Sequence, residues 1–169
     1  VKGNSVVCPF HLWSWGSDGV CDDIPYAKKI PDKAVIKSWP TLEKNGLVFV
    51  WQDAEGNGPI PEQEPARQED CYSGEWTDWQ MAAIPIKSLG RELVDNMADM
   101  AHFGPIHYSK VKSFKNTMEG HKFVQYMVGG HQILTEGDGG LITSVATYEG
   151  PAYMTTTMTG LMDGHPMTT

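Results

Sequence analysis

Two short stretches of the sequence combine residue types that bind metals. In the first, Cys8-Pro9-Phe10-His11 places a thiol and an imidazole with two residues between them, after a short apolar run. Such a pair can supply part of a zinc site, although zinc ribbons use two pairs. It can also supply half of an iron–sulfur cluster in which two Cys hold one iron and two His the other. The spacing alone settles neither, because a buried Cys beside an unrelated His looks the same.

The second stretch lies at the end of a predicted helix and leads into a second histidine. Residues three and four apart share a helical face, which predicts a polar stripe of Glu92, Asp95, Asn96, Asp99 and His102. Most such stripes are simply solvated. Here His107 follows His102 by five positions, about 140° around an ideal helix. Gly104-Pro105 lies between them and is predicted to break the helix, because Pro lacks a backbone donor.

A bend at Gly104-Pro105 would bring both imidazoles to one point, as two arms of the 2-His-1-carboxylate site of non-haem Fe(II) oxygenases. Asp99 lies one turn before His102, where it can accept an imidazole N–H. Asn96, on the same stripe, is a second candidate catalytic residue. Apolar side chains nearby either line a pocket for a bulky substrate or form plain core; these are Met97, Met100, Phe103, Met127 and Met154.

The elements around these stretches change in character along the chain. Residues 1–52 read as short strands with tight turns at Gly16–Gly19 and Asn45-Gly46, which tolerate positive φ. Residues 53–75 are a connector rich in Gly, Pro and Glu. Residues 76–169 are predicted to form a second domain. Its expected elements are a strand at Trp76–Ile86, a helix at Lys87–Phe103, and strands at Lys122–Val128, Leu141–Tyr148 and Ala152–Met158.

Composition excludes several classes of function. The chain of 169 residues has a formal net charge of −8, which argues against a nucleic-acid partner and an anionic membrane surface. No apolar run is long enough for a membrane span. The three cysteines are a poor disulfide framework, so we expect a cytoplasmic protein in which Cys21 is structural.

The sequence resembles the α-subunits of Rieske non-haem iron oxygenases over most of residues 1–160, and within them the 3-ketosteroid 9α-hydroxylase oxygenase family. The segment Cys8–Gly16 is similar to the second cluster-binding loop of these enzymes, and the Asp99–His107 stretch follows in the order the family requires. Further matching segments are Asp18–Cys21, Ile24–Ala27, Gly46–Trp51, Glu75–Trp79, Asp99–Phe103 and Gly150–Met154.

The resemblance implies an α+β fold with a role for each half. Residues 1–52 would be the C-terminal part of an all-β Rieske domain, with Cys8 and His11 binding a 2Fe-2S cluster. Residues 76–169 would begin a helix-grip (START-type) catalytic domain with an antiparallel sheet, in which His102 and His107 bind the mononuclear iron. Asp99 would pass electrons from the cluster of a neighbouring subunit.

The resemblance also implies partners: a homotrimer, O2, a bulky apolar substrate such as a 3-ketosteroid, and a separate NADH-dependent flavin and iron–sulfur reductase. The first C-x-H cluster loop and a third iron ligand are absent from the sequence, so we expect the chain to be a fragment that is inactive alone. His121, His131 and His165 are expected to be ordinary surface or core residues.

Three other functions are considered. An aromatic-ring dioxygenase or demethylase of the same superfamily would use the same metals on a smaller substrate. A Rieske electron carrier would have no use for the iron motif after residue 90. A structural zinc module would combine Cys8 and His11 with other ligands.

Overall fold

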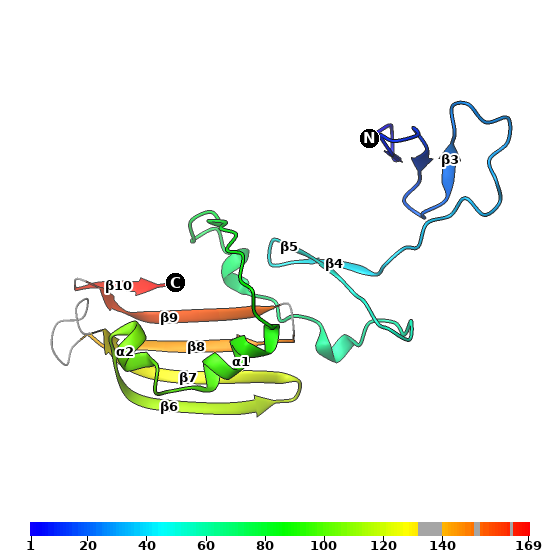
Figure 1. Cartoon of the computed structure of the whole chain (residues 1–169). Helices are drawn as coiled ribbons and strands as arrows, with labels where there is room; N and C mark the ends of the chain where they lie inside the picture. The colour runs from blue at the N-terminus through cyan, green and yellow to red at the C-terminus, as the bar shows by residue number, and fades with distance from the viewer. Residues whose placement is uncertain (132–139, 151–152, 163) are drawn as a thin grey trace. The chain divides into compact units, whose positions relative to one another are not determined.

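A computed structural model describes residues 1–131, 140–150, 153–162 and 164–169. The chain forms two compact units. Unit 1 comprises Val1–Pro61 with Arg67–Ser73, and unit 2 comprises Glu62–Ala66 with Gly74–Thr169. Figure 1 shows the strands and helices of both units.

Unit 1 begins with a small antiparallel sheet in the order β1-β2-β3. These strands are Val6–Val7, Ser14–Trp15 and Cys21–Asp23. A small core of buried Cys21, Ile24 and Ala34 packs beside Trp13 and Trp15. The burial of Cys21 agrees with its expected structural role.

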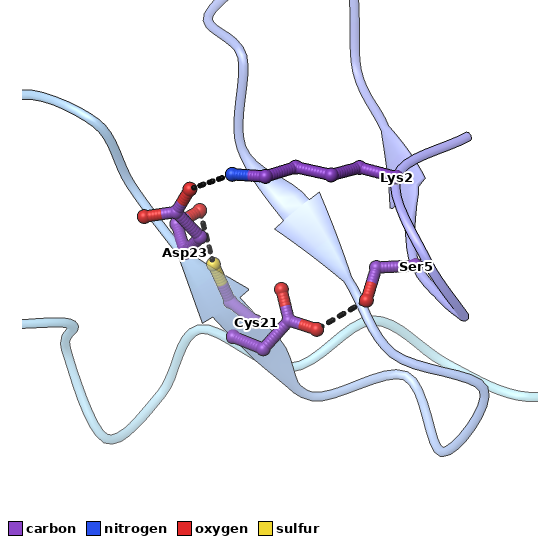
Figure 2. Close-up of polar contacts among 5 residues, drawn as sticks. Lys2, Ser5, Cys21 and Asp23 are labelled. Atoms are coloured by element: carbon purple, nitrogen blue, oxygen red, sulfur yellow. Dashed lines mark hydrogen bonds and ion pairs between the residues drawn. The ribbon is translucent and has the colours of Figure 1, made fainter.

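Polar side chains tie the first residues of the chain to strand β3. Lys2 Nζ lies 3.2 Å from Asp23 Oδ2, and the Ser5 hydroxyl donates to the Asp22 carboxylate. The Cys21 thiol points to the Asp23 carbonyl oxygen at 3.6 Å (Figure 2). Because the Lys2–Asp23 pair is solvent-exposed, its contribution to stability is small.

The second hairpin of unit 1 pairs β4 (Thr41–Lys44) with β5 (Leu47–Val50). The two-residue turn between them has positive φ at Asn45 (54°) and Gly46 (72°). This is the type I′ geometry that Asn-Gly favours. Asn45 is only 1% exposed. Its N–H donates to the Tyr72 hydroxyl at 2.7 Å, and its Oδ1 accepts the Gln68 N–H at 2.9 Å. The turn therefore anchors the segment around the short 3₁₀ helix η2 (Glu69–Cys71).

We predict that Asn45→Ala lowers the free energy of unfolding of unit 1 by about 1–3 kcal/mol, the cost of leaving a buried donor unsatisfied. Alanine also tolerates the left-handed conformation poorly. Denaturant unfolding followed by tryptophan fluorescence measures the change. The exposed Asn4→Ala is the matched control and should shift stability by less than about 0.5 kcal/mol. Equal effects of the two substitutions would show that the buried turn contacts are not stabilising.

Unit 2 is built on a five-stranded antiparallel sheet in the order β10-β9-β8-β7-β6. Helices α1 and α2 lie against one face of this sheet (Figure 1). The strands are Ser109–Glu119 (β6), Lys122–His131 (β7), Ile142–Tyr148 (β8), Met154–Met162 (β9) and His165–Thr168 (β10). Antiparallel strands thus predominate, as the sequence predicts, and helices are few in the described residues; the α+β class and the helix-grip arrangement stay predictions.

The long helix predicted at Lys87–Phe103 is wrong: two shorter helices stand in its place. Helix α1 spans Gly90–Ala98 and α2 spans Phe103–His107. The break lies at Asp99, whose backbone is extended (ψ 112°) and whose Oδ1 accepts the Ala101 N–H at 2.8 Å. Asp side chains compete in this way for the backbone N–H two residues on, which ends a helix.

The bend predicted at Gly104-Pro105 is also wrong, because both residues lie within α2. Pro105 is the third residue of the helix. Its missing N–H is one of the four that have no intrahelical partner at a helix start, so the helix loses no bond. The helix ends instead at His107, and the next residue, Tyr108, has a left-handed backbone (φ 50°). In the part of the chain described, no helix is long and apolar enough to cross a bilayer.

The strand predicted at Trp76–Ile86 is absent, and this segment has no regular structure. Its Trp79, Met81, Ile84 and Ile86 side chains are exposed. A strand is stable only where a neighbouring strand satisfies its backbone groups, and this segment pairs with none in the described structure.

A buried carboxylate fastens the start of unit 2 to its sheet. Glu149, at the end of β8, has a side chain only 2% exposed and lies 2.7 Å from Lys122 Nζ. Its second oxygen accepts the Ala66 N–H at 3.1 Å. The segment Glu62–Ala66, which includes part of the 3₁₀ helix η1 (Pro61–Gln63), is thereby held against the sheet.

Candidate metal centre and its cavity

A cavity of about 660 Å³ lies between the two helices and the sheet of unit 2. Ligand pockets are commonly about 300–1,000 Å³. Alternate residues of β7, β8 and β9 line the cavity, because side chains alternate between the faces of a strand. They are Gln125, Met127, Gly129, Ile142, Ser144, Ala146, Met154, Thr156 and Met158; Ser109 of β6 and Gly130 of β7 complete the sheet's share of the wall. The wall is therefore mostly apolar, with a few hydroxyl and amide groups.

The helical side of the cavity carries both predicted iron ligands. His102 immediately precedes α2 and His107 is its last residue. Their ring centroids are 5.1 Å apart with an interplanar angle of 69°. The His102 backbone is itself helical (φ −74°, ψ −20°), and its carbonyl oxygen accepts the Ile106 N–H at 2.9 Å, so a continuous stretch of helical backbone joins the two histidines. The structure thus brings the two imidazoles together without the predicted bend.

Phe103 packs against both imidazoles, and β6 supports it from the sheet. Its ring centroid is 4.6 Å from that of His102 and 5.5 Å from that of His107. Phe114 of β6 meets the Phe103 ring edge-on at 5.8 Å. Aromatic pairs in such tilted arrangements stabilise each other. The packing of α2 on β6 therefore helps to fix the histidine rings.

Asp99 lies beside His102, as the spacing predicts. Its Oδ2 is 3.3 Å from His102 Nδ1, and its carboxylate is half exposed while the His102 side chain is 14% exposed. The two groups are within ion-pair distance but are not aligned for a hydrogen bond, so Nδ1 is a buried nitrogen without a hydrogen-bond partner. With Nδ1 turned towards a carboxylate, Nε2 is the nitrogen left for a metal.

The pair fits part of a mononuclear iron site. Metal–nitrogen bonds to His are about 2.1 Å long, so rings as close as 5.1 Å can bind one ion. Within the described residues there is no group of three His, Cys, Asp or Glu side chains that could hold a metal. Asn96 lines the same cavity. The described residues therefore supply two imidazole ligands and no third ligand for the ion.

The predicted cluster-binding pair lies in unit 1, on the tight loop between β1 and β2. The Cys8 N–H donates to the Trp13 carbonyl and the Leu12 N–H to the Cys8 carbonyl, both at 2.9 Å. Leu12 has a positive φ of 61°, which allows the loop to close. Cys8 is half-buried and His11 is exposed, its ring stacked edge-on against Phe10 at 4.0 Å. Both residues thus lie on one short loop.

Sequence reasoning missed two residues that contact the helix before this site. Asn116 of β6 and Gln125 of β7 donate their side-chain amides to carbonyl oxygens at the end of α1. The only signal in the sequence is that the polar Gln125 lies among apolar residues, such as Val124 and Met127, of a predicted strand. Alternation alone does not show what such a residue binds.

Comparison with solved structures first shows which fold the chain shares. The structure resembles the crystal structure of the quaternary ammonium Rieske monooxygenase CntA in complex with L-carnitine. The TM-score is 0.53 at 18% identity, covering 98% of this chain and 50% of that one. At this identity the likeness shows the shared fold alone.

Comparison of the sequence with known proteins identifies a particular family. Residues 50–169 match the model of the 3-ketosteroid 9α-hydroxylase C-terminal domain, and the chain belongs to this family. It is 46% identical over 166 residues to a 3-ketosteroid-9-alpha-monooxygenase oxygenase component of Rhodococcus rhodochrous, covering 91% of this chain and 42% of the relative. The corresponding protein of Mycobacterium tuberculosis is 42% identical over 160 residues, with the same two coverages.

A relative that matches over a shorter stretch is cholesterol 7-desaturase of Xenopus laevis, which is 42% identical over 112 residues, 63% of this chain and 23% of the relative. The chain spans about two fifths of the length of the oxygenase components it matches.

Proposed function

We propose that the chain is part of the oxygenase component of a Rieske monooxygenase that hydroxylates a 3-ketosteroid at its 9α position. The observation that carries this proposal is the pair His102 and His107, with ring centroids 5.1 Å apart on the wall of an apolar cavity of about 660 Å³. Membership of the 3-ketosteroid 9α-hydroxylase family gives the substrate class.

The halves of the chain have different roles in this proposal. Residues 1–52 form the C-terminal part of the Rieske domain, residues 53–75 a connector, and residues 76–169 the first part of a helix-grip catalytic domain of α+β type. Cys8 and His11 bind the 2Fe-2S cluster, since Rieske clusters take one Cys and one His from each of two loops. The short β1–β2 loop supports this role, because it holds both side chains on one turn.

His102 and His107 hold the mononuclear iron through their imidazole nitrogens, and a carboxylate from outside the described residues completes the site. When bound, the ferrous ion supplies O2 activation, with electrons delivered from the Rieske cluster. In the overall reaction one O2, NADH and a proton convert a steroid C–H into C–OH, with release of water and NAD⁺. A separate NADH-dependent reductase with flavin and iron–sulfur groups supplies the electrons.

The cavity suits a rigid apolar substrate. Its methionines come from three elements: Met97 from α1, Met127 from β7, and Met154 with Met158 from β9. Met side chains adapt to irregular apolar shapes. Ser144 and Thr156 offer hydroxyl groups to polar ends of a substrate. Met100, also expected near the substrate, is exposed and not part of the cavity wall.

Asp99 connects the two metals in this proposal. Half of its carboxylate surface is open while one oxygen lies 3.3 Å from His102 Nδ1. A group so placed can contact His102 and, at the same time, a residue of another subunit. In this proposal the protein is a cytoplasmic homotrimer in which the electron crosses between subunits through Asp99. Asn96, on the cavity wall, is a lesser candidate for contact with the reacting groups.

Sterol desaturation is a second candidate, favoured by the 42% identity to the Xenopus laevis cholesterol 7-desaturase. The same metals would then remove two hydrogens from the substrate, forming a double bond, with both oxygen atoms leaving as water. A small aromatic substrate, as in ring dioxygenases, would fill an apolar cavity of this size poorly.

The full-length protein, supplied with a reductase, NADH and ¹⁸O2, should convert a 3-ketosteroid into a 9α-alcohol with one labelled oxygen. Metal analysis should give about three irons per subunit and no zinc, two from the cluster and one from the mononuclear site. Two irons would indicate an electron carrier, and zinc a structural module. An unlabelled alkene product would indicate desaturation instead.

A further inference from the structure

Two side-chain amides of the sheet hold the end of helix α1. Asn116 of β6 and Gln125 of β7 are directly opposite each other in the antiparallel register. Asn116 Nδ2 donates to the Ala98 carbonyl oxygen at 3.1 Å, and Gln125 Nε2 donates to the Met97 carbonyl oxygen. Opposed residues of an antiparallel pair share one face of the sheet. We call Asn116 and Gln125 the amide clamp.

The clamp satisfies groups that the helix itself leaves open. The last four carbonyls of an α-helix have no intrahelical donor, and α1 ends at Ala98. Gln125 is only 4% exposed, so its bond to Met97 is shielded from water, whereas the Asn116 bond is exposed. Met97, whose carbonyl is held, is itself buried in the cavity wall. The helix end is therefore fixed to the sheet at two successive residues.

The residues that directly follow the two clamped carbonyl groups belong to the candidate metal centre. Asp99 follows Ala98, and its Oδ1 holds the turn through the Ala101 N–H. His102 comes next, one residue before α2. A shift of the end of α1 would therefore move Asp99 relative to the two histidines, which are joined through α2 because the His102 carbonyl oxygen accepts the Ile106 N–H at 2.9 Å. The clamp thus sets where the Asp99 carboxylate lies relative to the His102 imidazole.

We infer that Asn116 and Gln125 are positioning residues for the mononuclear iron site, acting through the end of α1 on Asp99, the carboxylate beside His102. The inference rests on the proposed function, because it assumes that His102 and His107 bind iron. It adds two residues that carry no metal-binding chemistry and that neither touch the metal nor belong to either motif. Groups that orient ligands from outside commonly change metal affinity or activity by about 10–100-fold when lost.

The test uses Gln125→Met and Asn116→Leu in the full-length protein, since each removes the donor at similar side-chain volume. After depletion of the mononuclear iron with the cluster intact, Fe(II) is titrated back without steroid, well below the unfolding temperature. We expect Gln125→Met to raise the Kd for Fe(II) about tenfold or more. Asn116→Leu should have a smaller effect in the same direction, because its bond is exposed.

A second readout reports geometry rather than stability. The electron paramagnetic resonance spectrum of the Fe(II)–nitric oxide adduct depends on how the ligands are arranged around the iron. We expect Gln125→Met to broaden and shift this spectrum at iron saturation. If that variant does not fold, Asn116→Leu gives the same test, since its side chain lies on the exposed part of β6.

Tyr126→Phe is the matched control. Tyr126 is next to Gln125 on β7 but is not part of the cavity wall, and its hydroxyl donates to Glu119 Oε1 at 3.0 Å. It too loses one side-chain hydrogen bond, and it should leave both iron readouts unchanged.

If the clamp variants showed only a lower unfolding temperature, with an unchanged Kd for Fe(II) and an unchanged spectrum, the inference would be overturned. The two amides would then only stabilise the fold. A failure of the proposed function looks different: wild-type Fe(II) binding would then survive both His102→Ala and His107→Ala.

Discussion

His102→Ala is expected to abolish oxygenation by the full-length protein and to remove the mononuclear iron, while the visible spectrum of the Rieske cluster persists. His102 is one of two imidazoles at the cavity, and the other cannot replace it. Loss of a residue that only orients a metal ligand costs about 10–100-fold in activity or affinity, so loss of a ligand should cost more. The cluster survives because Cys8 and His11 belong to unit 1, whereas His102 belongs to unit 2.

Iron content, the visible spectrum and steroid hydroxylation are measured on the same preparation. His165→Ala is the control, since His165 begins β10 and is exposed. It should keep iron and activity at the wild-type level. Thermal unfolding is recorded for both variants, because the largely buried His102 ring also packs against Phe103. Retained iron and retained activity in folded His102→Ala would show that the metal binds elsewhere.

Asp99→Asn is expected to slow steroid hydroxylation by about 10–100-fold, with the mononuclear iron still bound at saturating Fe(II). Asparagine keeps an Oδ1 that can accept the Ala101 N–H, so the turn after α1 should persist. What is lost is the negative charge 3.3 Å from His102 Nδ1. A pre-reduced cluster mixed rapidly with O2 and steroid should therefore be reoxidised more slowly than in the wild type.

Asp95→Asn is the matched control for this experiment. Asp95 lies one turn earlier on α1, is exposed, and is 3.8 Å from Arg91. The same change of charge there should leave reoxidation and turnover unchanged. If both variants slowed turnover equally, the effect would come from the charge of the helix surface. A normal reoxidation rate in Asp99→Asn would remove Asp99 from the electron path.

The features of this protein that depend on local chemistry can be predicted from its sequence. Asn45-Gly46 predicts a tight turn, because these residues tolerate the positive φ that the observed type I′ turn requires. Alternation of apolar residues predicted strands at the positions of β7 and β8. The spacing of Asp99, His102 and His107 identified the candidate metal site, since residue type and short separation carry that signal. Their roles as iron ligands and electron path stay predictions.

The position of the helix break and the contacts that hold the end of α1 depend on long-range packing. The sequence predicts a bend at Gly104-Pro105, yet Pro105 fits the first turn of α2 and the break falls at Asp99. The amide clamp joins Ala98 to Asn116 and Met97 to Gln125, across 18 and 28 positions of the sequence. Such contacts form only when strands from a distant part of the chain come beneath the helix, and no local propensity encodes them. The sequence therefore names the chemical groups, and packing sets their geometry.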